Sequence, residues 1–163
     1  MRNEIVVKSR SGKVWRQADP KDQLFSSDAS PFFHLTRLVS LYQIRMDAHL
    51  KPIGMDIPRW RVLAILHEHE YAPIGRIADL AVIRISTMTK LIYRMENEDL
   101  ISTSVSEHDA RVTDVRLTEK GMQVFTEVRG IASLIFGRAF HNFDDHEIRT
   151  LINTCSKIYQ NIY

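Results

Sequence analysis

The chain has 163 residues, is 44% hydrophobic and 26% charged, and contains one cysteine. This composition is typical of a globular domain and excludes wholesale disorder and a disulfide scaffold. No apolar run reaches the roughly 18 residues of a membrane span, and no apolar core of a secretory signal is found near the start, so we expect a cytoplasmic protein without a membrane partner. The formal net charge of +2 lies within residues 1–30, so overall charge does not by itself indicate a nucleic-acid binder.

The N-terminal third predicts an extension followed by two helices. Residues 1–30 are polar and lack periodicity, which predicts a mobile arm. After Ser30, a suitable N-cap, a helix is expected over residues 31–53, with an apolar stripe formed by Phe32, Leu35, Leu38, Val39, Tyr42 and Met46. A second helix is expected from about residue 58 to residues 69–71, with an apolar side formed by Trp60, Leu63, Ala64 and Leu66.

The middle of the chain predicts two short helices and a hairpin. The first helix covers residues 74–81, with apolar Ile77, Ala78 and Leu80. The second covers residues 86–98, with Ser86 as the N-cap and a buried stripe formed by Met88, Leu91, Ile92 and Met95. Residues 101–106 and 112–117 are rich in Val, Thr and Ile, which favours two strands joined by a polar tip.

Two helices are expected to close the chain. Thr118 caps the first, which continues to about Phe140, and a D-x-x-E capping box begins the last at Asp144. The apolar stripe of the last helix comprises Ile148, Leu151, Ile152, Cys155, Ile158 and Tyr159, so Cys155 is expected to be packed in the core rather than to act as a redox sensor. The element order predicts a mostly α fold containing a winged helix-turn-helix with a two-stranded β-wing.

In a winged helix-turn-helix, the second short helix enters the major groove of DNA. Residues 83–95 suit this position because they contain three cations and no acidic residue: Arg84, Lys90 and Arg94. Opposite the apolar stripe lie Ser86, Thr87, Lys90, Tyr93 and Arg94, whose polar groups can bind phosphates or base edges. The alternative interpretation is an ordinary amphipathic surface helix.

The hairpin tip carries an arginine that suits a minor groove. The negative potential of a narrow minor groove attracts arginine, and Arg111 lies at this tip. Asp109 can orient it through a charge-assisted hydrogen bond. The alternative is a solvated ion pair in a turn.

Two of these motifs resemble the MarR family of bacterial transcription regulators. The run Ser86–Glu96 resembles the recognition helix of that family. Asp109-Ala110-Arg111, followed by Val115–Gly121, resembles its D-x-R wing and V-x-L-T-x-x-G motif, and Ile77–Leu80 is similar to the helix before the turn. The resemblance covers about residues 32–163. It implies that Ser86, Thr87, Thr89, Lys90 and Arg94 face DNA and that Arg111, braced by Asp109, enters the minor groove.

The resemblance also implies an organisation and a mode of action. Residues 31–56 and 119–163 would form long N- and C-terminal dimerisation helices, residues 57–118 the DNA-binding lobe and residues 1–30 an extension. The implied function is a homodimeric, ligand-responsive repressor that binds double-stranded DNA at a pseudo-palindromic operator. An effector such as a small aromatic acid or its thioester would bind His34, Arg37, Leu41, Trp60 and Leu63, which are otherwise ordinary core and surface residues.

The sequence departs from the family pattern at the start of the wing, and it leaves a second function open. Asp99 stands where the family usually has glycine before the wing, and Ser102 and Thr103 replace basic residues. A dimeric protein-interaction module with a winged-helix shape is the alternative function. No nucleophile–base spacing or Gly-rich phosphate loop indicates an enzyme or a cofactor, and His67 with Glu70 is expected to be a solvated helix end rather than a metal site.

Overall fold

The computed structural model describes residues 12–106 and 109–163. The chain forms two units, Met1–Arg45 and Met46–Tyr163. The predicted arm over residues 1–11 and tip residues 107–108 lie outside the described part of the chain. Within that part, no helix has both the length and the apolar character needed to cross a membrane.

The first unit contains two short elements that were not predicted. Helix α1 (Lys13–Ala18) and the 3₁₀ helix η1 (Ser27–Ala29) precede the long helix α2 (Pro31–Leu50). The prediction that residues 1–30 lack regular structure was therefore wrong for these segments. The Arg16 guanidinium binds both carboxylate oxygens of Asp22, at 2.8 and 3.2 Å. This ion pair connects the end of α1 to the loop that follows it, and no periodic pattern in the sequence indicates it.

Helix α2 begins at Pro31 as predicted, and its apolar stripe is largely exposed. Met46 and Leu50, near the end of the helix, are fully buried. Leu35 is half-buried, while the remaining members are exposed: Phe32, Leu38, Val39 and Tyr42. Periodicity therefore identified the helix correctly but did not predict what covers its apolar face.

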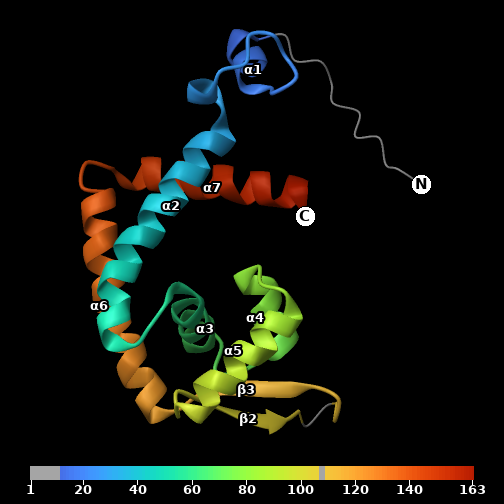
Figure 1. The fold of residues 1–163 in the computed structure, drawn as a ribbon, viewed down its shortest axis with the longest axis vertical. Helices are drawn as coiled ribbons and strands as arrows, with labels where there is room; N and C mark the ends of the chain where they lie inside the picture. Colours follow the sequence, from blue (N-terminus) through green and yellow to red (C-terminus); the bar gives the residue numbers. More distant parts are fainter. Residues whose placement is uncertain (1–11, 107–108) are drawn as a thin grey trace. The chain divides into compact units, whose positions relative to one another are not determined.

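The second unit contains the helix-turn-helix and the wing. After the 3₁₀ helix η2 (Lys51–Ile53) come α3 (Ile57–Glu68), α4 (Ile74–Ala81), α5 (Ile85–Asn97), α6 (Glu119–Ala139) and α7 (Asp145–Ile162). Strands β2 (Ile101–Val105) and β3 (Thr113–Leu117) form the predicted hairpin, next to α5 in Figure 1. A two-residue strand, β1 (Ala72–Pro73), was not predicted, and it pairs with β3 to make an antiparallel sheet of order β1-β3-β2.

The core of this unit gathers around α5. All four predicted stripe residues, Met88, Leu91, Ile92 and Met95, are buried. On α4, Ile77 and Ala78 are buried as predicted, but Leu80 is 40% exposed and Ala81 is buried in its place. The apolar side of α5 is thus fully used in packing, and its opposite side is left to solvent.

The end of α5 is fixed by a close approach between two backbone segments. Asp99 has a left-handed φ of 58°, and the Leu100 N–H donates to the Met95 carbonyl at 3.0 Å, which closes a Schellman turn. The Leu100 carbonyl in turn accepts from the Thr118 N–H at 3.2 Å. A Cβ at Gly121, in the first turn of α6, would lie 2.9 Å from the Leu100 carbonyl carbon and closer still to its oxygen. Only glycine fits there.

Helix α7 begins with the predicted capping box between Asp144 and Glu147, but it buries no residue. Cys155 is exposed, so the prediction that it packs in the core was wrong. Its stripe neighbours Ile152 and Tyr159 are also largely exposed. The amphipathic pattern was correct, but Ile148, Leu151 and Ile158 are only half-buried, and the rest of the apolar face is exposed.

Replacing Val82 with glycine is expected to raise the free energy of unfolding by about 1 kcal/mol. Val82 ends α4 with a left-handed φ of 52°, which strains a β-branched side chain, and its side chain is 72% exposed, so little packing is lost. Urea unfolding followed by circular dichroism measures the change. The matched control is Val105→Gly in β2, which is expected to lower stability because glycine weakens a strand. Equal losses in both variants would contradict the strain at Val82.

Candidate nucleic-acid interface

Helix α5 starts one residue earlier than expected. Arg84 is its N-cap residue and makes no side-chain capping hydrogen bond, so the prediction that Ser86 is the N-cap was wrong. Ser86 lies in the first turn of the helix and is exposed. The first turn of α5 therefore presents Arg84, Ser86 and Thr87 to solvent, with no acidic residue among them. Because the N-terminal end of a helix also attracts anions, this turn suits phosphate.

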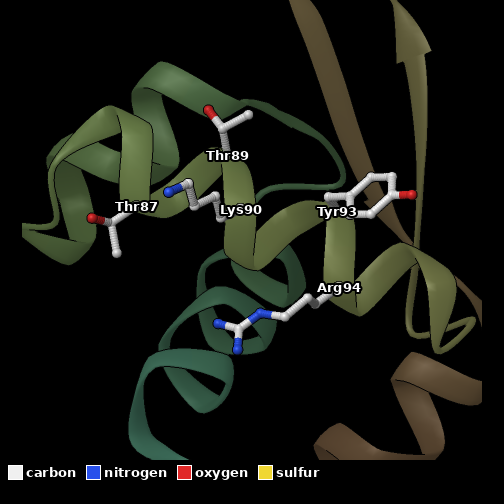
Figure 2. A pocket seen from close by; sticks show the side chains of 5 residues that line it. All are labelled: Thr87, Thr89, Lys90, Tyr93 and Arg94. Atoms are coloured by element: carbon white, nitrogen blue, oxygen red, sulfur yellow. The ribbon is translucent and has the colours of Figure 1, made fainter.

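The outer face of α5 is hollowed and basic. The side chains that line the hollow, shown in Figure 2, are Thr87, Thr89, Lys90, Tyr93 and Arg94. Four of them were predicted to face DNA. Tyr93 was recognised as outward-facing but was not among the predicted DNA-binding residues, although its ring is 65% exposed. Its phenol group adds a neutral donor beside the two cations of this face.

Thr89 is already engaged by its own helix. Its hydroxyl donates to the Ile85 carbonyl one turn earlier, at 2.9 Å. The hydroxyl proton is therefore not free for a phosphate, while the oxygen can still accept a hydrogen bond and the methyl group adds apolar surface. Contact with a thymine methyl group is one way in which threonine recognises a base.

Two arginines of α3 help to hold the helix-turn-helix in place. Arg59 is largely buried and binds Glu98, just after α5, at 2.6 Å. Arg61 donates to the Ala81 carbonyl at the end of α4, at 3.4 Å. These contacts join α3 to the ends of both short helices, so α5 is anchored by polar contacts as well as by its buried stripe.

The wing tip contains the predicted ion pair. The Arg111 guanidinium donates to both carboxylate oxygens of Asp109, at 3.0 and 2.9 Å, and its backbone N–H donates to the same carboxylate at 3.0 Å. The Arg111 side chain is 90% exposed. Asp109 therefore restricts the arginine without hiding it.

These hydrogen bonds determine how the tip responds to pH. The side-chain hydrogen bond from Arg111, followed by its backbone N–H, lowers the pKa of Asp109. A group with a lowered pKa contributes its stabilisation above its unfolded-state pKa and loses it as the pH falls through the folded-state value. The pair therefore stays charged at neutral and mildly acidic pH.

The residues predicted to bind an effector belong to different units. His34, Arg37 and Leu41 lie on α2 and are exposed, and His34 Nε2 is 2.7 Å from the Asp28 carbonyl. In the second unit, Trp60 is half-buried and stacks on Phe125 with ring centroids 5.5 Å apart. Leu63 is fully buried in the core.

Comparison with known proteins identifies the family. Residues 55–113 match the model of the MarR family. The HTH-type transcriptional repressor IacR of Pseudomonas putida is 35% identical over 144 residues, which cover 88% of this chain and 86% of that protein. The chain belongs to the MarR family. As a MarR-family protein it is a DNA-binding transcription regulator, as the sequence motifs predicted.

Solved structures of MarR regulators share the fold. A MarR-family regulator from Silicibacter pomeroyi has a TM-score of 0.77 and 22% identity, and the match covers 85% of this chain and 93% of that one. CouR from Rhodococcus jostii RHA1, solved with p-coumaroyl-CoA, has a TM-score of 0.75 and 19% identity, and the match covers 82% and 94%. The predicted winged-helix fold is therefore confirmed.

The turn before the wing is kept although its residue differs from the MarR pattern. Asp99 occupies the position at which the family usually has glycine, and it adopts the left-handed conformation that favours glycine. Aspartate is one of the residues that tolerate this conformation, so the turn is kept. The departure from the family pattern therefore leaves the base of the wing intact.

Proposed function

We propose that the chain is a homodimeric repressor that binds a pseudo-palindromic operator. Each copy would place α5 in a major groove and Arg111 in the adjacent minor groove. The observation that carries the proposal is the outer face of α5, where cations and hydroxyls are exposed and no acidic side chain is present. The second unit carries both this face and the arginine-tipped wing.

Within this proposal the polar residues have distinct roles. Arg84, Ser86 and Thr87, in the first turn, contact phosphates and the nearest base edges. Lys90 and Arg94 follow at one-turn intervals and contact a guanine edge or a phosphate. Thr89 contributes its methyl group, since its hydroxyl proton is bound to Ile85. Tyr93 donates to a phosphate.

Lys90→Ala is expected to weaken operator binding by about tenfold and to reduce the salt dependence of binding if Lys90 contacts a phosphate. The operator is first obtained by selecting bound duplexes from a random library, and affinity is then measured by fluorescence anisotropy at several salt concentrations. Lys157→Ala on α7 removes the same charge from a helix that carries no proposed DNA contact, and it serves as the control. Equal affinities for the two variants would count against the DNA-reading role of α5.

The proposed dimer follows from the uncovered face of α7. Ile152, Tyr159 and Ile162 are about half exposed or more, and the other apolar residues of this helix are not buried either. A second copy of the same chain is the occupant we propose, because two such faces can bury one another around a twofold axis.

Ile152→Glu is expected to convert the dimer to a monomer at micromolar concentration, because it places a charge within the proposed apolar interface. Sedimentation equilibrium measures the mass, and circular dichroism verifies that the helices persist. Asn153→Glu introduces the same charge on the opposite face of α7 and should leave the dimer intact. If Ile152→Glu sediments like the wild type, α7 is not the interface.

We further propose that an aromatic acid or its thioester regulates DNA binding. His34, Arg37 and Leu41, all exposed on α2, are the proposed effector-binding residues of the first unit, with Arg37 pairing with the carboxylate. CouR, a relative in fold, was solved with p-coumaroyl-CoA, which supports this ligand class. In the second unit, Leu63 is fully buried and Trp60 stacks on Phe125, so both residues serve the packing of that unit. The effector would act by favouring a dimer conformation that fits the operator poorly.

A further inference from the structure

The one acidic side chain of α5 points to the wing rather than to DNA. Glu96, in the last turn of the helix, is half-buried. Its Oε1 accepts two hydrogen bonds from Thr103 on β2, from the backbone N–H at 3.0 Å and from the hydroxyl at 2.6 Å. Both the main chain and the side chain of Thr103, a residue of the wing, thus bind the Glu96 carboxylate.

The position of β2 in the sheet explains why this contact matters. The strand order is β1-β3-β2, so β2 is an edge strand, and one of its sides has no neighbouring strand. Backbone N–H groups on such a side need another partner. The Glu96 carboxylate supplies it at Thr103, in the middle of the strand. The edge of the wing is therefore attached to α5 through a side chain.

This attachment is separate from the turn that joins the two elements. The Schellman turn at Asp99 and Leu100 links the end of α5 to the start of β2 by backbone contacts. Thr103 lies two residues into the strand, so Glu96 provides a second point of attachment. The pairing of β3 with β1 holds the other side of the hairpin, so Glu96 adds an attachment to α5 at the open edge of β2, which restricts the angle between the helix and the hairpin further. Arg111 lies at the far end of the same hairpin. A small change in the angle between α5 and the hairpin therefore displaces Arg111 more than residues near the base of the wing.

We propose that Glu96 is a positioning residue that sets the angle of the wing relative to α5 and thereby the reach of Arg111 into the minor groove. The inference rests on the proposed function, in which α5 and Arg111 bind the same DNA. A carboxylate on a DNA-binding helix would otherwise repel phosphate. Here both Thr103 donors hold it against β2.

Glu96→Ala is expected to lower operator affinity by about tenfold, and the loss should depend on Arg111. In an Arg111→Ala background, the same substitution should change affinity less than twofold, because the guanidinium that Glu96 positions is already absent. Glu96→Gln, whose amide oxygen can accept both hydrogen bonds, should recover most of the wild-type affinity. Glu127→Ala on α6 removes an exposed carboxylate elsewhere and controls for the change in charge.

Footprinting separates positioning from a general loss of structure. Glu96→Ala should lose hydroxyl-radical protection at the flanking minor grooves while it keeps guanine N7 protection in the major groove. The inference would be overturned if Glu96→Ala lowered operator affinity by the same factor with and without Arg111. It would also be overturned if Glu96→Gln bound the operator as weakly as Glu96→Ala. If the wild type selects no duplex from the random library, the proposed function fails instead, so the two failures are distinguishable.

Discussion

Gly121→Ala is expected to destabilise the second unit by about 3 kcal/mol or more, a large fraction of the unfolding free energy of an ordinary domain. The added Cβ would lie within 3 Å of the Leu100 carbonyl group. The obstacle is backbone, so it cannot rotate away as a flexible side chain could. Leu100 is itself held by hydrogen bonds to Met95 and Thr118. Relieving the clash would therefore mean opening the turn at the base of the wing.

The measurement is the midpoint of urea unfolding, compared with that of a second glycine on the same helix. Gly130 lies in the interior of α6, and a Cβ there would meet nothing within 4 Å. Gly130→Ala is expected to raise stability by about 0.5–1 kcal/mol, because alanine favours a helix more than glycine does. If both alanine variants unfolded at the wild-type midpoint, the close approach at Leu100 would not exist in solution.

Arg111→Ala is expected to weaken binding to the selected operator by roughly 100-fold, because the proposed twofold dimer would lose one minor-groove arginine in each half-site. The reason lies in the geometry of the tip. Asp109 holds the guanidinium in one orientation while 90% of the side chain stays exposed, so little order has to be gained on binding. The loss should be greatest for operators with A·T-rich flanks, where the minor groove is narrow.

Arg116→Ala is the matched control for this experiment. Arg116 also belongs to the wing, on β3, but its guanidinium lies over the Tyr71 ring, 5.0 Å from the centroid. The substitution removes the same charge from the same hairpin without touching the tip. Affinity is measured by anisotropy and oligomeric state by sedimentation. If Arg116→Ala and Arg111→Ala weakened binding equally, the wing would contribute only through its charge.

The helices were predictable because their buried faces follow a period. The stripe from Met88 to Met95 identified α5, and the span of α4 was correct to the residue. The boundaries depended on local chemistry that periodicity does not contain. Ser86 is a favourable N-cap type, yet Arg84 occupies that position. Strand β1 has two residues, one of them proline, and forms only because β3 lies beside it.

The parts of the candidate site that could be predicted are those whose residues lie close together in the sequence. Asp109 and Arg111 are two residues apart, so their pairing could be inferred from sequence alone, and the cations of α5 followed from its outward positions. Glu96 was not singled out because its partner Thr103 belongs to another element. The exposure of Cys155 was mispredicted for a related reason, since an apolar stripe does not say whether its cover comes from the same chain.

In the proposed dimer, the exposed apolar face of α7 would link gene control to the amount of regulator in the cell. Helix α7 buries no residue in a single copy, so in the proposed dimer its apolar side would be covered only when two copies meet. At protein levels below the dimer dissociation constant, the concentration of paired molecules rises with the square of the total. Promoter occupancy would then change steeply with synthesis and dilution, so that a modest drop in copy number switches transcription on.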